Sequence, residues 1–202
     1  MALIEQIKKT LEAATGIARP DKDDLPALIK QRAPRLYRFE DDGKTPNNPR
    51  LPLILYRNVL RVSAGHDPAA VCEDMFAGHG WANGWRNGIH PFLHFHTRTH
   101  EVLGIARGTA RVEFGGDKGR TLDVQAGDVV VLPAGTGHRR VSSSADLLVV
   151  GAYPTTGGSF DQARPNEIDP HQARRQIANV GRPAQDPVYG KDGPLTQLWA
   201  DH

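Results

Sequence analysis

The chain has 202 residues, of which 39% are hydrophobic and 24% are charged, values typical of one globular domain with or without extended ends. Lys and Arg total 25 against 23 Asp and Glu, and the resulting net charge of +2 does not create the basic surface of a nucleic-acid-binding protein. No apolar stretch reaches the roughly 20 residues that cross a membrane. We therefore expect neither nucleic acid nor membrane as a partner.

The first ten residues, MALIEQIKKT, place charged side chains where a secretory signal needs an unbroken apolar run. Cys72 is the only cysteine, so the chain cannot form an internal disulfide. Both features predict a cytoplasmic protein. We expect Cys72 to be a buried, unreactive side chain rather than a reactive thiol.

The N-terminal part of the chain, residues 1–35, is predicted to be a helical extension. Apolar residues recur at helical spacing from Leu3 to Ala14, and Gly16 follows where a helix would end. A second short helix is expected between Asp24 and Arg32. These helices are expected to cover a barrel or a partner subunit rather than to carry chemistry.

Short apolar runs separated by turn residues dominate the middle of the chain, between Leu51 and Tyr153. Each run is bounded by Gly, Pro, Asp or Ser: LPLILYRNVL, HPFLHFH, EVLGIARGTARVEF, TLDVQ, DVVVLP, HRRVS and DLLVVGAY. Short strands with regular turns are typical of a β-sandwich or β-barrel. We therefore predict a mainly β domain over residues 36–160.

Residues 161–202 are predicted to form a short helix and a tail that pack on this domain. Asp169, Pro170 and Gln172 stand where an N-cap, a first helical residue and a capping box require them, which predicts a helix ending near Ala178. The rest is expected to be an extended tail. The side chains that would anchor it are Val188, Tyr189, Leu195 and Trp199.

A cluster of histidines is the clearest chemical signal in the sequence. His90, His94, His96 and His100 lie close together, and Glu101 follows directly. Because residues two apart on a strand face the same way, His94 and His96 can bind one ion together. A turn over residues 97–99 would bring Glu101 to the same point.

A fourth ligand is expected from His138, which follows a strand and a Pro/Gly turn in GDVVVLPAGTGH. Three imidazoles and one carboxylate suit Fe, Mn, Ni, Co or Zn, so we predict one divalent first-row transition metal. An octahedral ion would keep two positions open for a substrate. Four protein ligands would fill every position of a tetrahedral zinc ion, whose role would then be structural. We favour the open site, since a barrel of this size has room for one small ligand.

These residues resemble the two motifs of the cupin family. The first, G(x)5HxH(x)4E(x)6G, is matched by Gly88, His94, His96, Glu101 and Gly108. The second, G(x)5PxGxxH(x)3N, is matched by Gly127, Pro133, Gly135 and His138, with Ser142 in place of Asn. Residues 36–199 are also similar to uncharacterised stand-alone bacterial cupins. The resemblance implies a double-stranded β-helix, a jelly-roll-like barrel with the metal on His94, His96, Glu101 and His138 and, commonly, a homodimer.

Strand parity predicts which further side chains face the cavity. Those sharing a strand face with a metal ligand, and therefore expected to bind substrate, are Phe92, Leu103, Ile105 and Arg140. Arg140 would pair with a substrate carboxylate, or else lie on the surface. Trp81, Trp85 and Arg86 would form a lid or wall at the barrel mouth, or pack ordinarily.

Two residues are expected to support the ligands from behind. His100 should point to the opposite face of the strand from Glu101. Ser142 stands where the family has Asn, so its hydrogen bond to the metal site is in doubt. His90 is expected at the barrel rim, where it would be solvated.

The metal site leads to three functional hypotheses. The first is a metal-dependent enzyme acting on a small polar or carboxylate-bearing metabolite, as an oxygenase or other oxidoreductase, with an isomerase or lyase next. The second is a non-catalytic module whose metal helps to bind a sugar or small acid. The third is a metal-free isomerase with His or Tyr as general base.

Overall fold

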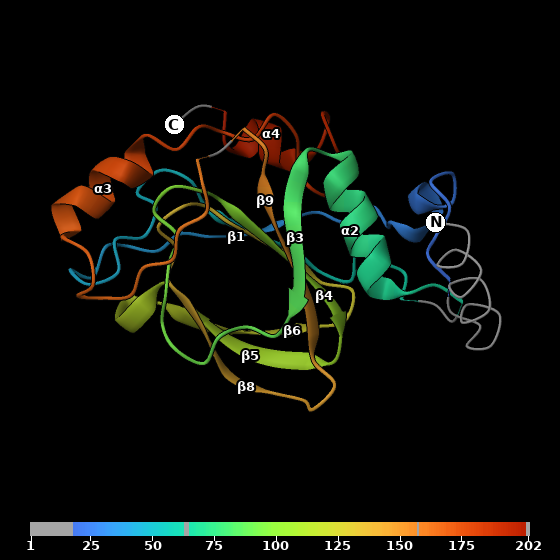
Figure 1. Cartoon of the computed structure of the whole chain (residues 1–202), viewed down its shortest axis with the longest axis horizontal. Helices are drawn as coiled ribbons and strands as arrows, with labels where there is room; N and C mark the ends of the chain where they lie inside the picture. The colour runs from blue at the N-terminus through green and yellow to red at the C-terminus, as the bar shows by residue number, and fades with distance from the viewer. Residues whose placement is uncertain (1–17, 63–64, 157, 201–202) are drawn as a thin grey trace, which may run out of the picture.

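The computed structural model describes residues 18–62, 65–156 and 158–200. Antiparallel strands form two sheets that face each other across a barrel, as Figure 1 shows. The larger sheet has the order β1-β2-β7-β4-β9-β3 and the smaller one β6-β5-β8. The fold is a mainly β, jelly-roll double-stranded β-helix, as predicted.

The elements have the following bounds. The larger sheet contains β1 (Arg35–Tyr37), β2 (Leu53–Tyr56), β7 (Val129–Leu132), β4 (Glu101–Arg107), β9 (Leu148–Pro154) and β3 (Trp81–Asn87). The smaller sheet contains β6 (Arg120–Gln125), β5 (Thr109–Phe114) and β8 (His138–Ser143). The helices are η1 (Leu25–Leu28), α2 (Pro68–Gly78), η2 (Gly116–Lys118), α3 (Pro170–Ala178) and α4 (Pro194–Leu198).

An apolar core fills the space between the two sheets. Leu103 and Val130 from the larger sheet pack with Val112 and Val124 from the smaller one, and all four are buried. Side chains at alternate positions of each strand supply this core. This inner core fills one part of the barrel. Polar residues occupy the other end, where β4 and β8 begin.

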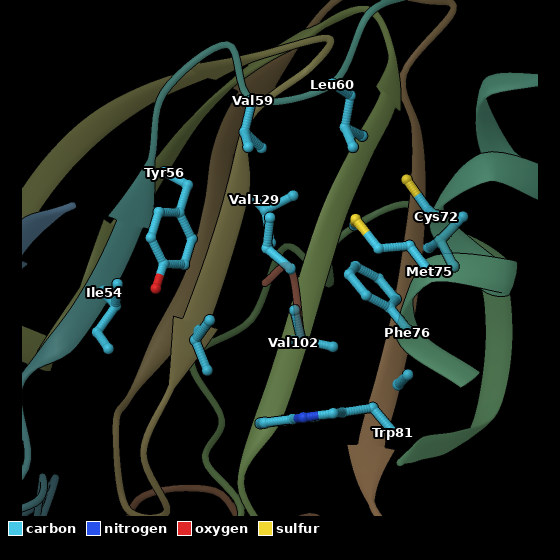
Figure 2. Close-up of a cluster of buried hydrophobic side chains, with 14 of the residues drawn as sticks. Ile54, Tyr56, Val59, Leu60, Cys72, Met75, Phe76, Trp81, Val102 and Val129 are labelled. Carbon is cyan, nitrogen blue, oxygen red and sulfur yellow. The ribbon is translucent and has the colours of Figure 1, made fainter. Parts of the chain in front are cut away.

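A second core covers the outer face of the larger sheet. Figure 2 shows Cys72, Met75 and Phe76 of α2 beside Val102 of β4 and Val129 of β7. Because both faces of β4 are covered, residues 101–106 are all buried. This explains why β4 reads as a continuous apolar run rather than as an alternating one.

The close packing of α2 depends on a glycine of β4. A Cβ atom on Gly104 would lie 2.7 Å from Sγ of Cys72 and 3.0 Å from Cζ of Phe76. We expect Gly104→Val to push α2 from the sheet and to lower the free energy of unfolding by about 1–3 kcal/mol, measured by chemical denaturation. Gly88→Val is the control, since a Cβ at Gly88 meets nothing within 4 Å. Equal stability of the two variants would contradict this packing.

The predicted helices of the chain ends have different outcomes. The helix expected to end near Ala178 is confirmed as α3, and the Asp169 carboxylate accepts a hydrogen bond from the Gln172 N–H at 2.8 Å. The helix predicted from Leu3 to Ala14 lies outside the described residues. The helix expected over residues 24–32 is only the short 3₁₀ helix η1.

The prediction of strands alone between residues 51 and 153 is wrong at α2. This helix begins with Asp67 as N-cap and Pro68 in its first turn, the same signal that identified α3. Its apolar side chains make no narrow stripe, because six of its residues are buried. The run at residues 90–96 forms only isolated bridges at His94 and Phe95.

The tail is anchored but not wholly extended, since it contains α4. Val188, Leu195 and Trp199 are buried in the outer core, as predicted, with Tyr189 packed against it. The Trp199 indole N–H donates to the carbonyl of Pro52 at 3.1 Å. Within the described ranges, no helix is both long and apolar enough to span a bilayer.

Candidate metal centre

Three buried imidazoles meet at one end of the barrel. One ring nitrogen from each of His94, His96 and His138 lies within 4.8 Å of the others. His138 begins β8, and an isolated antiparallel bridge joins its backbone to that of His94. This bridge holds the two rings with centroids 4.1 Å apart. The three histidines predicted to share an ion therefore lie together.

Glu101 brings a carboxylate to the same point. It is the first residue of β4 and is only 2% exposed. Its Oε2 atom lies 3.3 Å from Nε2 of His96 and 3.3 Å from Nε2 of His138. The structure thus gathers all four of the side chains that the spacing selected.

The backbone sets the orientation of each of the three imidazoles. In each ring Nδ1 faces a carbonyl oxygen: that of Phe92 for His94 at 3.2 Å, that of Asp161 for His96, and that of Thr136 for His138 at 3.1 Å. A carbonyl only accepts hydrogen bonds, so Nδ1 carries the proton in each neutral ring. The lone pair of Nε2 is then available to a metal ion in all three.

Two polar atoms of the cluster are buried without a hydrogen-bond partner among the described residues. They are Nε2 of His96 and Oε2 of Glu101. Leaving such atoms unsatisfied costs about 1–3 kcal/mol each, and more for a charged group. A divalent ion between them would satisfy both, and three imidazoles with one carboxylate form a suitable donor set. The residues present therefore fit a metal ion.

The protonation states of His94 and Glu101 suit metal binding, whereas a metal ion would have to compete with a proton at His96. Burial, followed by the nearby His138 and His96, lowers the pKa of His94 to about 2. Burial would favour a neutral Glu101, but the adjacent His96 and His138 hold the pKa of its carboxyl well below the ordinary value. For His96, burial is outweighed by Glu101 and the Asp161 carbonyl, which raise its pKa. A charged carboxylate beside a neutral His94 is what a metal ion requires.

Asp161 positions His96, although no motif in the sequence marks it. Its carboxylate accepts the N–H groups of Thr97 and Arg98, both at 2.9 Å, and the hydroxyl of Thr97 at 2.7 Å. Its carbonyl meets Nδ1 of His96. No spacing signal could have found it, because Asp161 lies 65 residues from His96 and beyond the last strand.

His100 lies behind the centre, as its parity predicted. Its Nδ1 accepts the Ala134 N–H at 2.9 Å, and its ring packs on Trp199 with centroids 4.8 Å apart. Burial lowers the pKa of His100 to about 4, so the ring is neutral at physiological pH. It connects the loop before His138 to the tail.

The structure places Ser142 outside the site, against the expectation. The register between β5 and β8 shifts between Arg111 and Val112, which pair with Ser142 and Arg140. The shift leaves Val141 as an extra residue in β8, and such a bulge inverts the parity of the strand. Ser142 is therefore exposed.

A cavity of about 440 Å³ opens beside the cluster. Its apolar and aromatic wall is made by Trp85, Ile89, Leu103, Tyr153 and Phe160. Polar side chains from Asn83, Arg86, Asn87, His90 and Gln162 complete it. The wall predicted for Trp85 and Arg86 is present, while Trp81 belongs to the outer core (Figure 2).

The predicted substrate-binding residues are only partly at the cavity. Leu103 lines it, whereas Ile105 lies within the inner core. The ring of Phe92 stacks on His90 with centroids 4.6 Å apart, and the Arg164 guanidinium lies 3.8 Å over its centre. Phe92 therefore packs against these two side chains and is not among the described residues that line the cavity.

Arg140 does not line the cavity either. Its Nε donates to the Ile89 carbonyl at 3.1 Å and its Nη1 to the Ser143 hydroxyl at 2.8 Å. The guanidinium thus braces the chain between β3 and the histidines. The structure does not place it where a substrate carboxylate would need it.

Trp85 and Tyr153 form a hydrogen-bonded pair on the cavity wall. The indole N–H donates to the Tyr153 hydroxyl at 2.9 Å, and the Tyr153 ring lies 5.8 Å from that of His96. Burial and then the Glu101 charge raise the pKa of Tyr153, so the phenol keeps its proton. Tyr153 therefore presents a hydroxyl donor beside the metal centre.

Comparisons with known proteins agree with this architecture. Residues 84–166 match the family model described as Cupin. "Uncharacterized protein YjlB" from Bacillus subtilis (strain 168) is 41% identical over 171 residues, which are 84% of this chain and 98% of that protein.

Solved structures show partial similarity. Oxalate decarboxylase from Bacillus subtilis is 22% identical over 47% of this chain and 26% of its own, with a TM-score of 0.31. Acireductone dioxygenase from Bacillus anthracis, with a cadmium ion in its active centre, is 18% identical over 45% of this chain and 61% of its own, with a TM-score of 0.33. An 11S globulin from Wrightia tinctoria is 13% identical over 46% of this chain and 29% of its own, with a TM-score of 0.33. This chain thus spans less than two thirds of each of these solved chains.

Proposed function

Since the chain belongs to the cupin family, we propose that it is a metal-dependent enzyme acting on a small metabolite that binds through a polar or carboxylate group. An oxygenase or related oxidoreductase is the leading class, followed by an isomerase or lyase. One observation carries this proposal: three imidazoles and a carboxylate converge at a cavity large enough for a small ligand.

His94, His96, Glu101 and His138 would hold one divalent first-row ion, Fe, Mn, Ni, Co or Zn. When bound, such an ion supplies Lewis acidity and, if it is redox-active, a site for dioxygen chemistry. The remaining roles belong to residues of the chain itself. The backbone carbonyls fix the imidazoles, the apolar wall limits the access of water, and the Tyr153 hydroxyl can donate a hydrogen bond to a ligand oxygen.

The test is metal content followed by turnover. Protein purified without a metal-affinity tag should contain about one first-row metal ion per chain by elemental analysis, as four converging ligands require. The Fe(II) form should then consume oxygen with at least one compound from a panel of diketones, catechols and hydroxy acids. Absence of metal would contradict the proposal and favour a metal-free isomerase.

A non-catalytic binding module for a sugar or small acid is the alternative, and it would use the same cluster. Saturable ligand binding by the metal-loaded protein without any turnover would identify it. Both proposals include a small-molecule ligand. The cytoplasmic location and the homodimer stay predictions from the sequence.

We also propose a division into an N-terminal extension (1–35), a barrel (36–160) and a C-terminal helix and tail (161–202). Asp161 and Gln162 support including the last part in the functional unit, since one orients His96 and the other lines the cavity. The tail would then serve the site as well as the stability of the barrel.

A further inference from the structure

Resting on the proposed function, we infer that the cavity selects ligands with a planar, apolar body and no second charged group, with only the metal-chelating end polar. Three features carry it: a fixed indole, an exposed phenyl ring at the entrance, and the commitment of the nearby guanidinium groups to other partners.

The indole of Trp85 is a rigid, flat surface. It lies directly on the backbone of Gly151 in β9, where any Cβ atom would collide with Cε2 and Cζ2 of the ring. Its N–H is held by the Tyr153 hydroxyl. Since the ring is confined on one face and at its edge, the indole is already ordered before a ligand arrives, and an aromatic ligand can stack without further loss of entropy.

Phe160 stands at the entrance with its ring mostly unburied. It is 54% exposed, an unusual state for a phenylalanine. Its ring lies 5.2 Å from that of Tyr153 and 5.4 Å from that of His96, measured between centroids. An apolar ligand body between this ring and the cavity wall would remove its exposed surface from water.

The charges nearby do not suit an anionic body. Arg86 is the only Lys or Arg among the described lining residues. Its guanidinium makes three hydrogen bonds to Glu73 and Asp67, at 2.6, 2.8 and 2.7 Å. Arg140 is engaged with a carbonyl and a hydroxyl. At the rim, the Arg164 guanidinium lies over the Phe92 ring, and Arg98 donates to the Phe160 carbonyl. A second carboxylate on the ligand would therefore be desolvated without a counter-charge.

A matched pair of 2-oxo acids tests the inference. Phenylpyruvate and 2-oxoglutarate share the same chelating end, but one carries a phenyl ring and the other a carboxylate. We expect the Ni(II)-loaded protein to bind phenylpyruvate about tenfold or more tightly than 2-oxoglutarate, from burial of the ring. Isothermal titration calorimetry and quenching of tryptophan fluorescence measure the affinities, and elemental analysis measures nickel in the same sample.

Variants of Phe160 sharpen the test, since its exposure makes substitution tolerable. Phe160→Ala should lower the affinity for phenylpyruvate by about tenfold and leave that for 2-oxoglutarate unchanged. Phe160→Lys should reverse the preference by placing a cation at the entrance. Leu36→Lys is the control, since Leu36 is 45% exposed on β1 and lies outside the cavity.

The outcomes separate this inference from the proposed function. Nickel-loaded protein that binds both acids equally, prefers 2-oxoglutarate or binds neither overturns the inference and leaves the metal centre standing. Protein that retains no nickel overturns both. A preference for phenylpyruvate that is unchanged in Phe160→Lys overturns the role given to Phe160 and with it the inference.

Discussion

Glu101→Gln should lower the affinity of the protein for its divalent ion by at least about 100-fold. Residues that only orient a metal ligand already contribute 10–100-fold, and Glu101 reaches two imidazole nitrogens directly, at 3.3 Å each. Glutamine has nearly the same shape but no charge, so the two Nε2 atoms lose their anionic partner. Elemental analysis after dialysis against a weak chelator measures the loss.

Glu113→Gln is the matched control for this substitution. Glu113 lies on β5 of the same barrel, and its carboxylate pairs with Arg139 at 2.9 Å. The chemical change is identical, but it occurs outside the cluster. Metal retention by Glu101→Gln equal to that of Glu113→Gln would show that Glu101 is not a ligand.

The convergence of the four residues was predictable because it depends on short-range geometry. One residue separates His94 from His96, and a turn over residues 97–99 precedes Glu101, so local conformation determines where these side chains point. His138 required one long-range assumption, that the strand after the Pro/Gly turn returns to the same end of the barrel. Its bridge to His94 is that contact.

The walls of the cavity were harder to predict because parity fails at irregularities. The bulge at Val141 moved Ser142 to the surface. In β3, Asn83 has a left-handed φ of 54° and the register shifts between Ala82 and Trp85. No alternating pattern therefore marks this strand.

Contacts between distant segments account for the remaining errors. Phe160 and Asp161 reach the site from a segment after the last strand, and their role follows from where that segment returns. Helix α2 has its N-terminal signal in Asp67 and Pro68, but its burial against the sheet depends on Gly104 far along the chain. One sequence alone does not indicate which of its distant residues contact each other.

Asp186→Ala should destabilise the protein by about 3–5 kcal/mol, a large effect for one substitution. The Asp186 carboxylate is fully buried and accepts the Tyr56 hydroxyl and the N–H groups of Val188, Tyr189 and Leu195, the last three at 2.8, 3.1 and 3.0 Å. Hydrogen bonds to a charged group contribute about 1.5–3 kcal/mol each, and their effects are not additive. Alanine would leave all four donors buried without this acceptor.

Two variants show whether the carboxylate itself is responsible. Asp192→Ala, an exposed position in the same tail, should change the free energy of unfolding by less than about 0.5 kcal/mol. Asp186→Asn should lose about half as much as Asp186→Ala, because the amide oxygen still accepts from some donors while its NH₂ group opposes the others. Chemical denaturation measures all three. A loss below about 1 kcal/mol for Asp186→Ala would mean that the apolar contacts of Val188, Leu195 and Trp199 hold the tail without the carboxylate, since one unmade buried hydrogen bond alone costs that much.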